Sequence, residues 1–202
     1  MYEVLTPNGT QAEYNFVAVN VNTDLQQLLD PVTPMREVFL KAVQVNGQQA
    51  DSINQAMLTV RSVVKRDIFL ESSSTNESGP PTKYVEVDFM TPVKGKNADY
   101  AKMEIDKFLP VHKQRMAMGA VKGWRLAQKV MPSATDEPYS YVTVNFYESI
   151  DMMLQGKYPE AIKKAWPTLD MTKLFQTVNT VKKEQRNQLW KLVDHAEASN
   201  PK

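Results

Sequence analysis

Two stretches of the sequence match each other at a constant spacing of 125 residues. Residues 130–150 (VMPSATDEPYSYVTVNFYESI) align without a gap on residues 5–25 (LTPNGTQAEYNFVAVNVNTDL). Farther along, residues 180–191 align on residues 59–70 at a spacing of 121. Self-similarity at a fixed spacing is typical of a repeated structural unit. The identical pairs are Pro7 and Pro132, Thr10 and Thr135, Tyr14 and Tyr139, Val17 and Val142, Val19 and Val144, and Asn20 and Asn145.

The repeat predicts how the chain is divided. The stretch SSSTNESGPPTK between the copies has the Ser, Gly and Pro composition of a linker. We therefore predict four parts: an incomplete first copy (1–70), a linker (71–83), a complete second copy (84–195) and a tail (196–202).

The first copy lacks a counterpart of residues 84–125, so it should lack an opening strand and helix. Unpaired backbone groups left by a missing strand cost free energy, and something must compensate. Three remedies stay open: about 40 further residues before Met1, a strand from a partner chain, or direct pairing of the neighbouring strands. We favour the first, which makes this chain a fragment, only slightly over the third.

The second copy has the pattern of strand, helix, strand, strand, helix, strand. Alternation of apolar and polar residues predicts strands, and apolar residues at spacings of three and four predict helices. Pro110 should kink the first helix near Leu109, and Gly119 suits its end. This order is the ferredoxin-like pattern of an α+β fold. The expected elements are a strand at 84–90, a helix at 97–118, a hairpin of 123–130 and 139–147, broken helices at 149–182 and a strand at 188–194.

The run DYAKMEIDKFLPVHKQRMAMGAVKGWRLAQKV, followed by YVTVNFYES, resembles the dimeric α/β-barrel superfamily. That group includes NIPSNAP-like, EthD-like and antibiotic-biosynthesis-monooxygenase-like proteins, and the chain looks closest to bacterial members without an assigned function. The resemblance implies two facing sheets that enclose a cavity, usually across a homodimer. A tandem chain would form that barrel within itself, with its first unit incomplete. Some relatives degrade haem, but the order of residues differs here, so we expect no cofactor.

Residues 139–147 show which side chains should line such a cavity. Val142, Val144 and Phe146 share one face, which we expect a helix to cover. Tyr141 and Asn145 lie on the opposite face, which suits a partly buried, semi-polar cavity wall. The alternative is a solvated face with incidental aromatic residues.

His112 is the candidate catalytic residue, because a neutral imidazole on the sheet-facing side of a helix can act as an acid or base near pH 7. The alternative is a histidine of the core with one hydrogen bond. Arg115 lies one helical turn along and could hold an anionic group of a ligand. Its alternative is a solvated side chain.

Trp124 and Trp190 could wall an apolar pocket, or simply pack in the core. Asp88 and Glu86 share one side of the first strand, which we expect to face away from the helices. Two neighbouring carboxylates raise each other's pKa, which suits acid–base chemistry. The alternative is an ion pair with lysine or arginine at a sheet edge.

Composition excludes several classes of protein. The chain has no cysteine, and two histidines make a transition-metal site improbable, so we expect no metal. A net charge of +1 without a basic stretch argues against nucleic acid, and no long apolar run predicts a membrane span. The first residues do not resemble a signal peptide. The compartment stays open between the cytoplasm and export after removal of a signal that this sequence does not contain.

Three functions remain open at this point. The leading interpretation is a protein that binds a small, partly apolar ligand in a cavity between two sheets. The second is a cofactor-independent monooxygenase-like or isomerase-like enzyme with His112 as the acid or base. The third is a structural or interaction module without a ligand. A homodimer is compatible with each of them.

Overall fold

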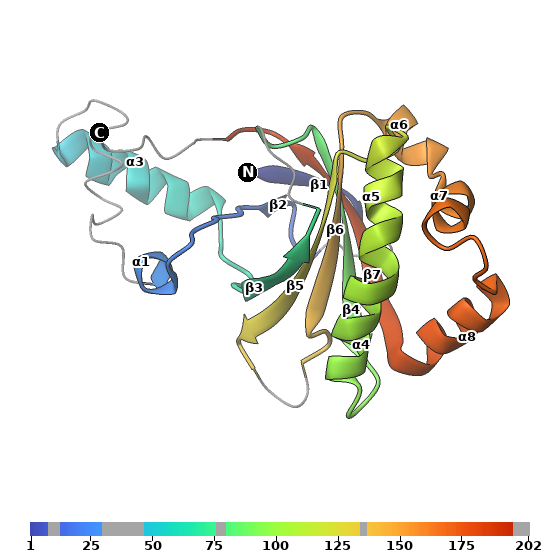
Figure 1. Cartoon of the computed structure of the whole chain (residues 1–202). Coiled ribbons are helices and arrows are strands. Elements are labelled where there is room, and N and C mark those ends of the chain that lie inside the picture. The colour runs from blue at the N-terminus through green and yellow to red at the C-terminus, as the bar shows by residue number, and fades with distance from the viewer. Residues whose placement is uncertain (8–12, 30–46, 76–79, 134–136, 196–202) are drawn as a thin grey trace. The chain divides into compact units, whose positions relative to one another are not determined.

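Seven antiparallel strands form one curled sheet, a half-barrel, in the computed structural model of the protein (Figure 1). Their order across the sheet is β2-β1-β7-β4-β6-β5-β3. The structure describes residues 1–7, 13–29, 47–75, 80–133 and 137–195. The strands are β1 (Tyr2–Pro7), β2 (Phe16–Val17), β3 (Ile68–Ser74), β4 (Tyr84–Pro92), β5 (Gly123–Met131), β6 (Tyr141–Tyr147) and β7 (Lys182–Leu192).

The chain divides into two units. The first comprises residues 1–17 and 67–202 and contains the whole sheet, and the second comprises residues 18–66. The second unit contains α1 (Leu25–Leu29) and α3 (Gly47–Val60). The helices of the first unit are α4 (Asn97–Met103), the π-helical turn η1 (Glu104–Phe108), α5 (Leu109–Ala117), α6 (Ile150–Gln155), α7 (Tyr158–Ala165) and α8 (Met171–Val181).

The elements of residues 84–192 follow the expected order, so the α+β class is confirmed. The predicted break near Leu109 coincides with the π-helical turn η1, which runs directly into α5, so Pro110 lies where the regular hydrogen-bond pattern of the helix changes. Gly119 has a φ of +67°, which ends this helical stretch in a conformation that other residues rarely adopt. The four strands lie in the order β7-β4-β6-β5.

The sheet has a core on each side. Helices α4, α5 and α8 cover one face, where Tyr100 of α4 and Val178 of α8 pack on Trp124 and Tyr141 (Figure 1). The other face is concave, and β1, β2 and β3 add side chains to it. This concave core contains Tyr2, Val85, Val87, Phe89, Tyr139, Val142 and Trp190, with Val17 and Phe69 packed against it.

The expected orientation of β6 was wrong. Val142, Val144 and Phe146 belong to the concave face, and the helices cover the face of Tyr141 and Asn145. Glu86 and Asp88 likewise lie on the helix-covered face and not on the opposite one. The alternation of side chains along a strand shows which residues share a face. It does not show which face the helices cover. Here curling of the sheet buries the apolar face, so the helices take the semi-polar one.

Residues 1–74 repeat the order of elements found in residues 123–192, namely two strands, helical segments and a strand. The hairpin register is also the same. Tyr2 pairs with Val17 as Ala127 pairs with Val142, and Glu3 pairs with Phe16 as Gln128 pairs with Tyr141. Each of these pairs differs from its counterpart by 125 positions on both strands.

The sheet ends at β2 on one side and at β3 on the other, and these two strands do not pair with each other. In the described residues β2 and β3 therefore do not close the sheet by pairing directly, which was the third remedy for the missing strand. β3 runs through Ser74, so the segment expected to be a linker starts as a strand, because pairing with β5 outweighs the serine-rich composition.

Candidate functional site

The structure places seven of the eight candidate residues on the helix-covered side of the sheet and Trp190 on the concave side. It brings His112, Arg115, Trp124 and Asn145 into one buried cluster. Tyr141 lies apart from the centre of this cluster and packs edge-on against Tyr100, with ring centroids 5.0 Å apart.

Arg115 is the centre of the buried cluster and is only 1% exposed. Its Nε donates to the carbonyl oxygen of Gly156 at 3.1 Å, and its Nη1 donates to Oδ1 of Asn145 at 3.0 Å. Its Nη2 donates to the hydroxyl of Tyr147 at 3.2 Å, and the guanidinium carbon lies 3.8 Å from the ring centroid of Tyr158. These contacts tie α5 to β6 and to the turn before α7.

His112 lies between Trp124 and Arg115, as its helical spacing predicted for a residue that faces the sheet. Its imidazole is 3% exposed and stacks on the indole of Trp124. Arg115 Nη1 lies 3.2 Å from His112 Nδ1, and since a guanidinium only donates, Nδ1 is the acceptor. Burial lowers the pKa of His112 well below its usual value, and the positive charges of Arg115 and Lys182 lower it further. His112 is therefore neutral, with its proton on Nε2.

The two carboxylates bind hydroxyl and amide groups. Glu86 accepts hydrogen bonds from the hydroxyl of Tyr147 at 3.0 Å and from Asn187 at 3.1 Å. Asp88 accepts from the hydroxyl of Thr143 at 3.2 Å and also from Asn187. Tyr147 connects Glu86 to Arg115, so the buried positive charge is balanced through one hydroxyl group. Burial and the charge of Glu86 raise the pKa of Tyr147, which keeps that hydroxyl protonated.

The helix-covered cluster has the features of a structural network. The guanidinium, imidazole and amide groups contact protein partners at hydrogen-bond distance, and both tryptophan and tyrosine rings pack against them. Satisfied, enclosed polar groups fix how elements pack and leave little capacity for a ligand.

A second cluster, which no sequence pattern predicted, lies on the concave face around Arg186 of β7. Its guanidinium carbon lies 4.2 Å from the ring centroid of Phe89, 5.5 Å from that of Tyr139 and 5.7 Å from that of Tyr14. Nη1 donates to Glu13 at 2.8 Å and Nη2 to the hydroxyl of Tyr14 at 3.0 Å. Nε is buried and has no hydrogen-bond partner within the described part of the chain.

Hydrogen bonds extend this concave cluster to one of the predicted residues. The hydroxyl of Tyr14 donates to Oε1 of Gln188 at 3.1 Å, and Trp190 Nε1 donates to the same oxygen at 3.0 Å. Trp190 also packs against Tyr2 of β1, with ring centroids 6.1 Å apart. Burial raises the pKa of Tyr14, although the charge of Arg186 opposes that rise.

Two further cations point to the concave side from β5. Lys129 is buried, and its ammonium group bonds Asp67 at 3.1 Å and also Glu137. Arg125 lies 3.6 Å from a carboxylate oxygen of Glu71, and its guanidinium carbon is 5.3 Å from the ring centroid of Phe146. The concave face thus combines aromatic rings with three cations, each of which contacts a carboxylate.

The sequence contained one signal for this cluster, the alignment of Tyr14 with Tyr139. Both tyrosines reach Arg186 in the structure. Arg186 itself was missed because the stretch KKEQRNQ has no apolar alternation, so the last strand was expected to start only at residue 188. In the structure β7 begins at Lys182, and pairing of its first residues with β4 extends it beyond the predicted start.

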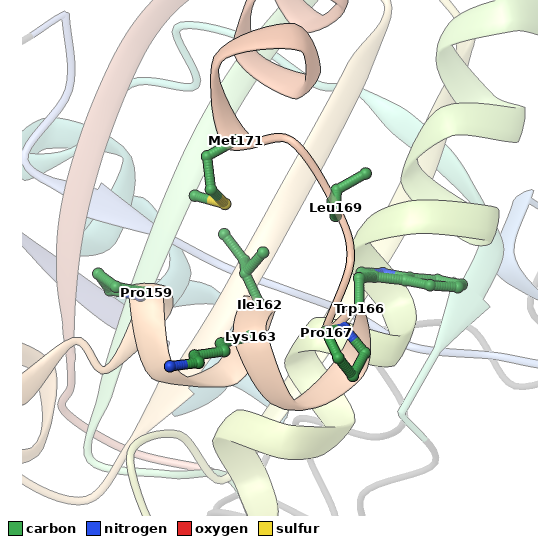
Figure 2. Close-up of a pocket in the computed structure, with 7 residues that line it drawn as sticks. All are labelled: Pro159, Ile162, Lys163, Trp166, Pro167, Leu169 and Met171. Carbon is green, nitrogen blue, oxygen red and sulfur yellow. The ribbon is translucent and has the colours of Figure 1, made fainter.

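A third feature is a surface pocket of about 290 Å³ beside the turn between α7 and α8 (Figure 2). Trp166 forms one wall, and its Nε1 donates to the carbonyl oxygen of Lys107 at 3.0 Å. The side chains that line the pocket are mostly apolar. Its lining residues are Pro159, Ile162, Lys163, Trp166, Pro167, Leu169 and Met171.

The chain matches no protein-family model, and no curated protein matches it. No helix in the described part of the chain is long and apolar enough to cross a lipid bilayer. Among the described residues, no three histidine or carboxylate side chains are grouped so that they could hold a metal ion.

Proposed function

We propose that the protein binds a small, partly apolar ligand with an acidic group on the concave face of the sheet. The observation that carries this proposal is the environment of Arg186, whose cation lies against three aromatic rings and whose buried Nε–H donor has no partner among the residues that the structure describes. The proposal keeps the ligand class expected from the sequence and moves the site to the other side of the sheet.

An aromatic carboxylate fits this face for two physical reasons. Its acidic group can accept hydrogen bonds from the guanidinium, which is planar and always charged. Its ring can pack on the apolar and aromatic side chains of β4 and β6, namely Phe89, Val144 and Phe146. Val144 and Phe146 are only partly buried, so their surfaces are available for such contact.

We also propose that residues 1–74 and 84–192 are tandem ferredoxin-like units of one intrachain α/β barrel, of which the first is incomplete. The matched hairpin registers support this proposal, and so do the helix caps. Asp24 accepts from the backbone N–H of Gln26 at 2.8 Å, and Ser149, 125 positions later, accepts from that of Met152 at 3.1 Å. In such an arrangement the concave face is the inside of the barrel.

The enzyme alternative with His112 finds less support. His112 is enclosed, its Nδ1 already accepts a hydrogen bond, and burial together with the neighbouring cations keeps it neutral. A general acid or base must reach the substrate proton directly or through one water. This environment favours the packing role that was the alternative for His112.

The test of the binding proposal uses two matched probes, 2-naphthoate and the uncharged 2-naphthalenemethanol. Isothermal titration calorimetry should show that the wild-type chain prefers the carboxylate, and that Arg186→Gln reduces this preference by about tenfold or more. Arg61→Gln is the matched control, because Arg61 is an exposed arginine outside the sheet. Equal affinity of both probes, or an unchanged preference in Arg186→Gln, would refute the proposal. A structural or interaction module without a ligand would then be the favoured function.

A further inference from the structure

We propose that the surface pocket between α7 and α8 binds a free alkyl carboxylate of medium chain length, with the alkyl chain in the pocket and the carboxylate at Lys163. All seven lining residues lie between Pro159 and Met171, within one stretch of the described chain and within the first unit. The site is separate from the concave face of the sheet, so this inference does not depend on the proposed function.

Backbone hydrogen bonds build the pocket from a short length of chain. The N–H of Trp166 donates to the carbonyl oxygen of Ile162 at 2.7 Å, and the N–H of Leu169 donates to that of Trp166 at 3.1 Å. Asp170 then caps α8, because its carboxylate accepts from the backbone N–H of Lys173 at 3.2 Å. These bonds fix the connection between the two helices, so the pocket is formed before a ligand binds.

The walls of the pocket are anchored to the helices around it. Trp166 already uses its polar atom, since its Nε1 donates to the carbonyl oxygen of Lys107 at 3.0 Å, and this leaves the apolar surface of the indole for a ligand. Ile162 is 2% exposed and belongs to the same core cluster as Val111 of α5. Met171 points toward Ile162 from the start of α8 (Figure 2), and its unbranched side chain can adapt to a bound chain.

The charge of the pocket selects an anion. Lys163 is the one charged residue among the seven that line it, and it is exposed. Within the described part of the chain, no carboxylate forms an ion pair with Lys163. A second cation, Lys107, lies 4.9 Å from the ring centroid of Trp166. In Figure 2 Lys163 and Trp166 lie on opposite sides of Ile162, so a chain that rests on Ile162 can reach the ammonium group with its end.

The size and the lining of the pocket select an alkyl chain. The volume of about 290 Å³ is at the lower end of the range of ligand pockets, roughly 300–1,000 Å³. None of the lining residues has a hydroxyl, amide or carboxylate side chain, so a sugar or a nucleotide would leave its polar groups without partners. An alkyl chain of about eight carbons needs apolar contact alone, and its carboxylate needs one cation at the rim.

The test uses the full chain labelled with 5-fluorotryptophan and follows the Trp166 resonance, assigned from Trp166→Phe, by fluorine NMR. Octanoate should shift this resonance saturably and bind roughly tenfold more tightly than hexanoate, because each buried methylene strengthens binding about threefold. Equal affinity of the two acids, or no saturable shift of the Trp166 resonance, would overturn the proposal. A shift caused by vesicles of an anionic phospholipid and not by octanoate would also overturn it, since a lipid surface would then be the partner.

A charge variant tests recognition of the carboxylate. Lys163→Gln should weaken binding of octanoate by about two- to fivefold, the range of an exposed ion pair, and leave binding of uncharged 1-octanol unchanged. Lys164→Gln is the matched control, because Lys164 is the next residue of α7, is also exposed and does not line the pocket. Equal weakening by both variants would contradict a carboxylate held at Lys163.

A second variant separates this pocket from the concave face. Arg186→Gln should leave the Trp166 shift and the affinity for octanoate unchanged. If octanoate shifts only the Trp190 resonance and Arg186→Gln abolishes that shift, the acid binds at the concave face. That result would overturn this inference and would support the proposed function.

Discussion

The imidazole of His112 stacks on the indole of Trp124, with ring centroids 4.7 Å apart and planes inclined by 12°. Arg115 Nη1 lies 3.2 Å from Nδ1 of the same imidazole. A second proton on this ring would therefore stand beside a guanidinium, away from water. The stacked pair joins α5 to β5, and it is stable only while His112 is neutral.

The first prediction is that this stack makes the fold sensitive to acid. Since the pKa of His112 is lowered in the folded state, the unfolded chain binds a proton first as the pH falls. Neutral His112 contributes fully to the free energy of unfolding above the unfolded pKa of about 6.5. This contribution declines as the pH falls from there to the folded pKa. The free energy of unfolding should fall between about pH 7 and pH 5, with a slope of at most about 1.4 kcal/mol per pH unit from this group.

Urea denaturation at several pH values measures this effect. His112→Gln should reduce the slope, because glutamine does not titrate. His195→Gln is the matched control, since His195 is exposed and is the only other histidine of the chain. If the two variants keep the same pH dependence as the wild type, His112 does not titrate as inferred.

The second prediction concerns Arg115 of α5, which bonds both β6 and the turn at Gly156 before α7. Arg115→Lys keeps the charge but cannot reach Gly156, Asn145 and Tyr147 with one planar fork. We expect a loss of about 3 kcal/mol or more in the free energy of unfolding, typical of a broken buried charge network. Chemical denaturation measures it, with Lys113→Ala on the exposed side of α5 as the control. A loss as small as that of the control would contradict the assigned role.

The third prediction concerns Lys129, whose side chain is 2% exposed and bonds both Asp67 and Glu137. Burial lowers the pKa of Lys129, but its bonds to these carboxylates outweigh burial and leave the pKa raised. Lys129→Met removes the cation and leaves the two carboxylates without it. We expect a loss of about 3 kcal/mol or more in the free energy of unfolding, because breaking a buried ion pair by removing one partner is costly.

Hydrogen exchange locates the effect of Lys129→Met. Asp67 directly precedes β3, so amide protons of β3 should exchange faster in this variant, while those of β4 change less. Lys122→Met is the control, because Lys122 is exposed. If amide exchange becomes faster by the same factor in all strands of the sheet, the variant is destabilised as a whole. That result would contradict the inference that Lys129 holds β3 to β5 locally.

Local patterns predicted much of residues 84–192. Strand β4 followed from the alternation of Val85, Val87 and Phe89, and the start of α5 followed from Pro110, because both depend on neighbours in sequence. The buried orientation of His112 also followed from helical spacing.

Contacts between distant parts of the chain could not be predicted in this way. Pairing of β1 with β7 and of β3 with β5 joins segments more than fifty residues apart, and no local pattern encodes such a choice. The site at Arg186 depends on this pairing, because Glu13 and Tyr14 reach it only through the position of β1 and β2. The covered faces of β6 were assigned wrongly for the same reason.

The three tryptophans of the chain each report on a different candidate site. Trp124 lies in the helix-covered cluster, Trp166 walls the surface pocket, and Trp190 belongs to the concave face. Trp190 is connected to Arg186 through Gln188 and Tyr14. Fluorine labels on these rings therefore distinguish the three places in one experiment.

The most direct test is fluorine NMR of the chain labelled with 5-fluorotryptophan, with each resonance assigned from a single Trp→Phe variant. During titration with 2-naphthoate, binding at the concave face predicts a saturable shift of the Trp190 resonance that is lost in Arg186→Gln. A saturable shift of Trp124 or Trp166 with Trp190 unchanged would place the ligand elsewhere and contradict the account.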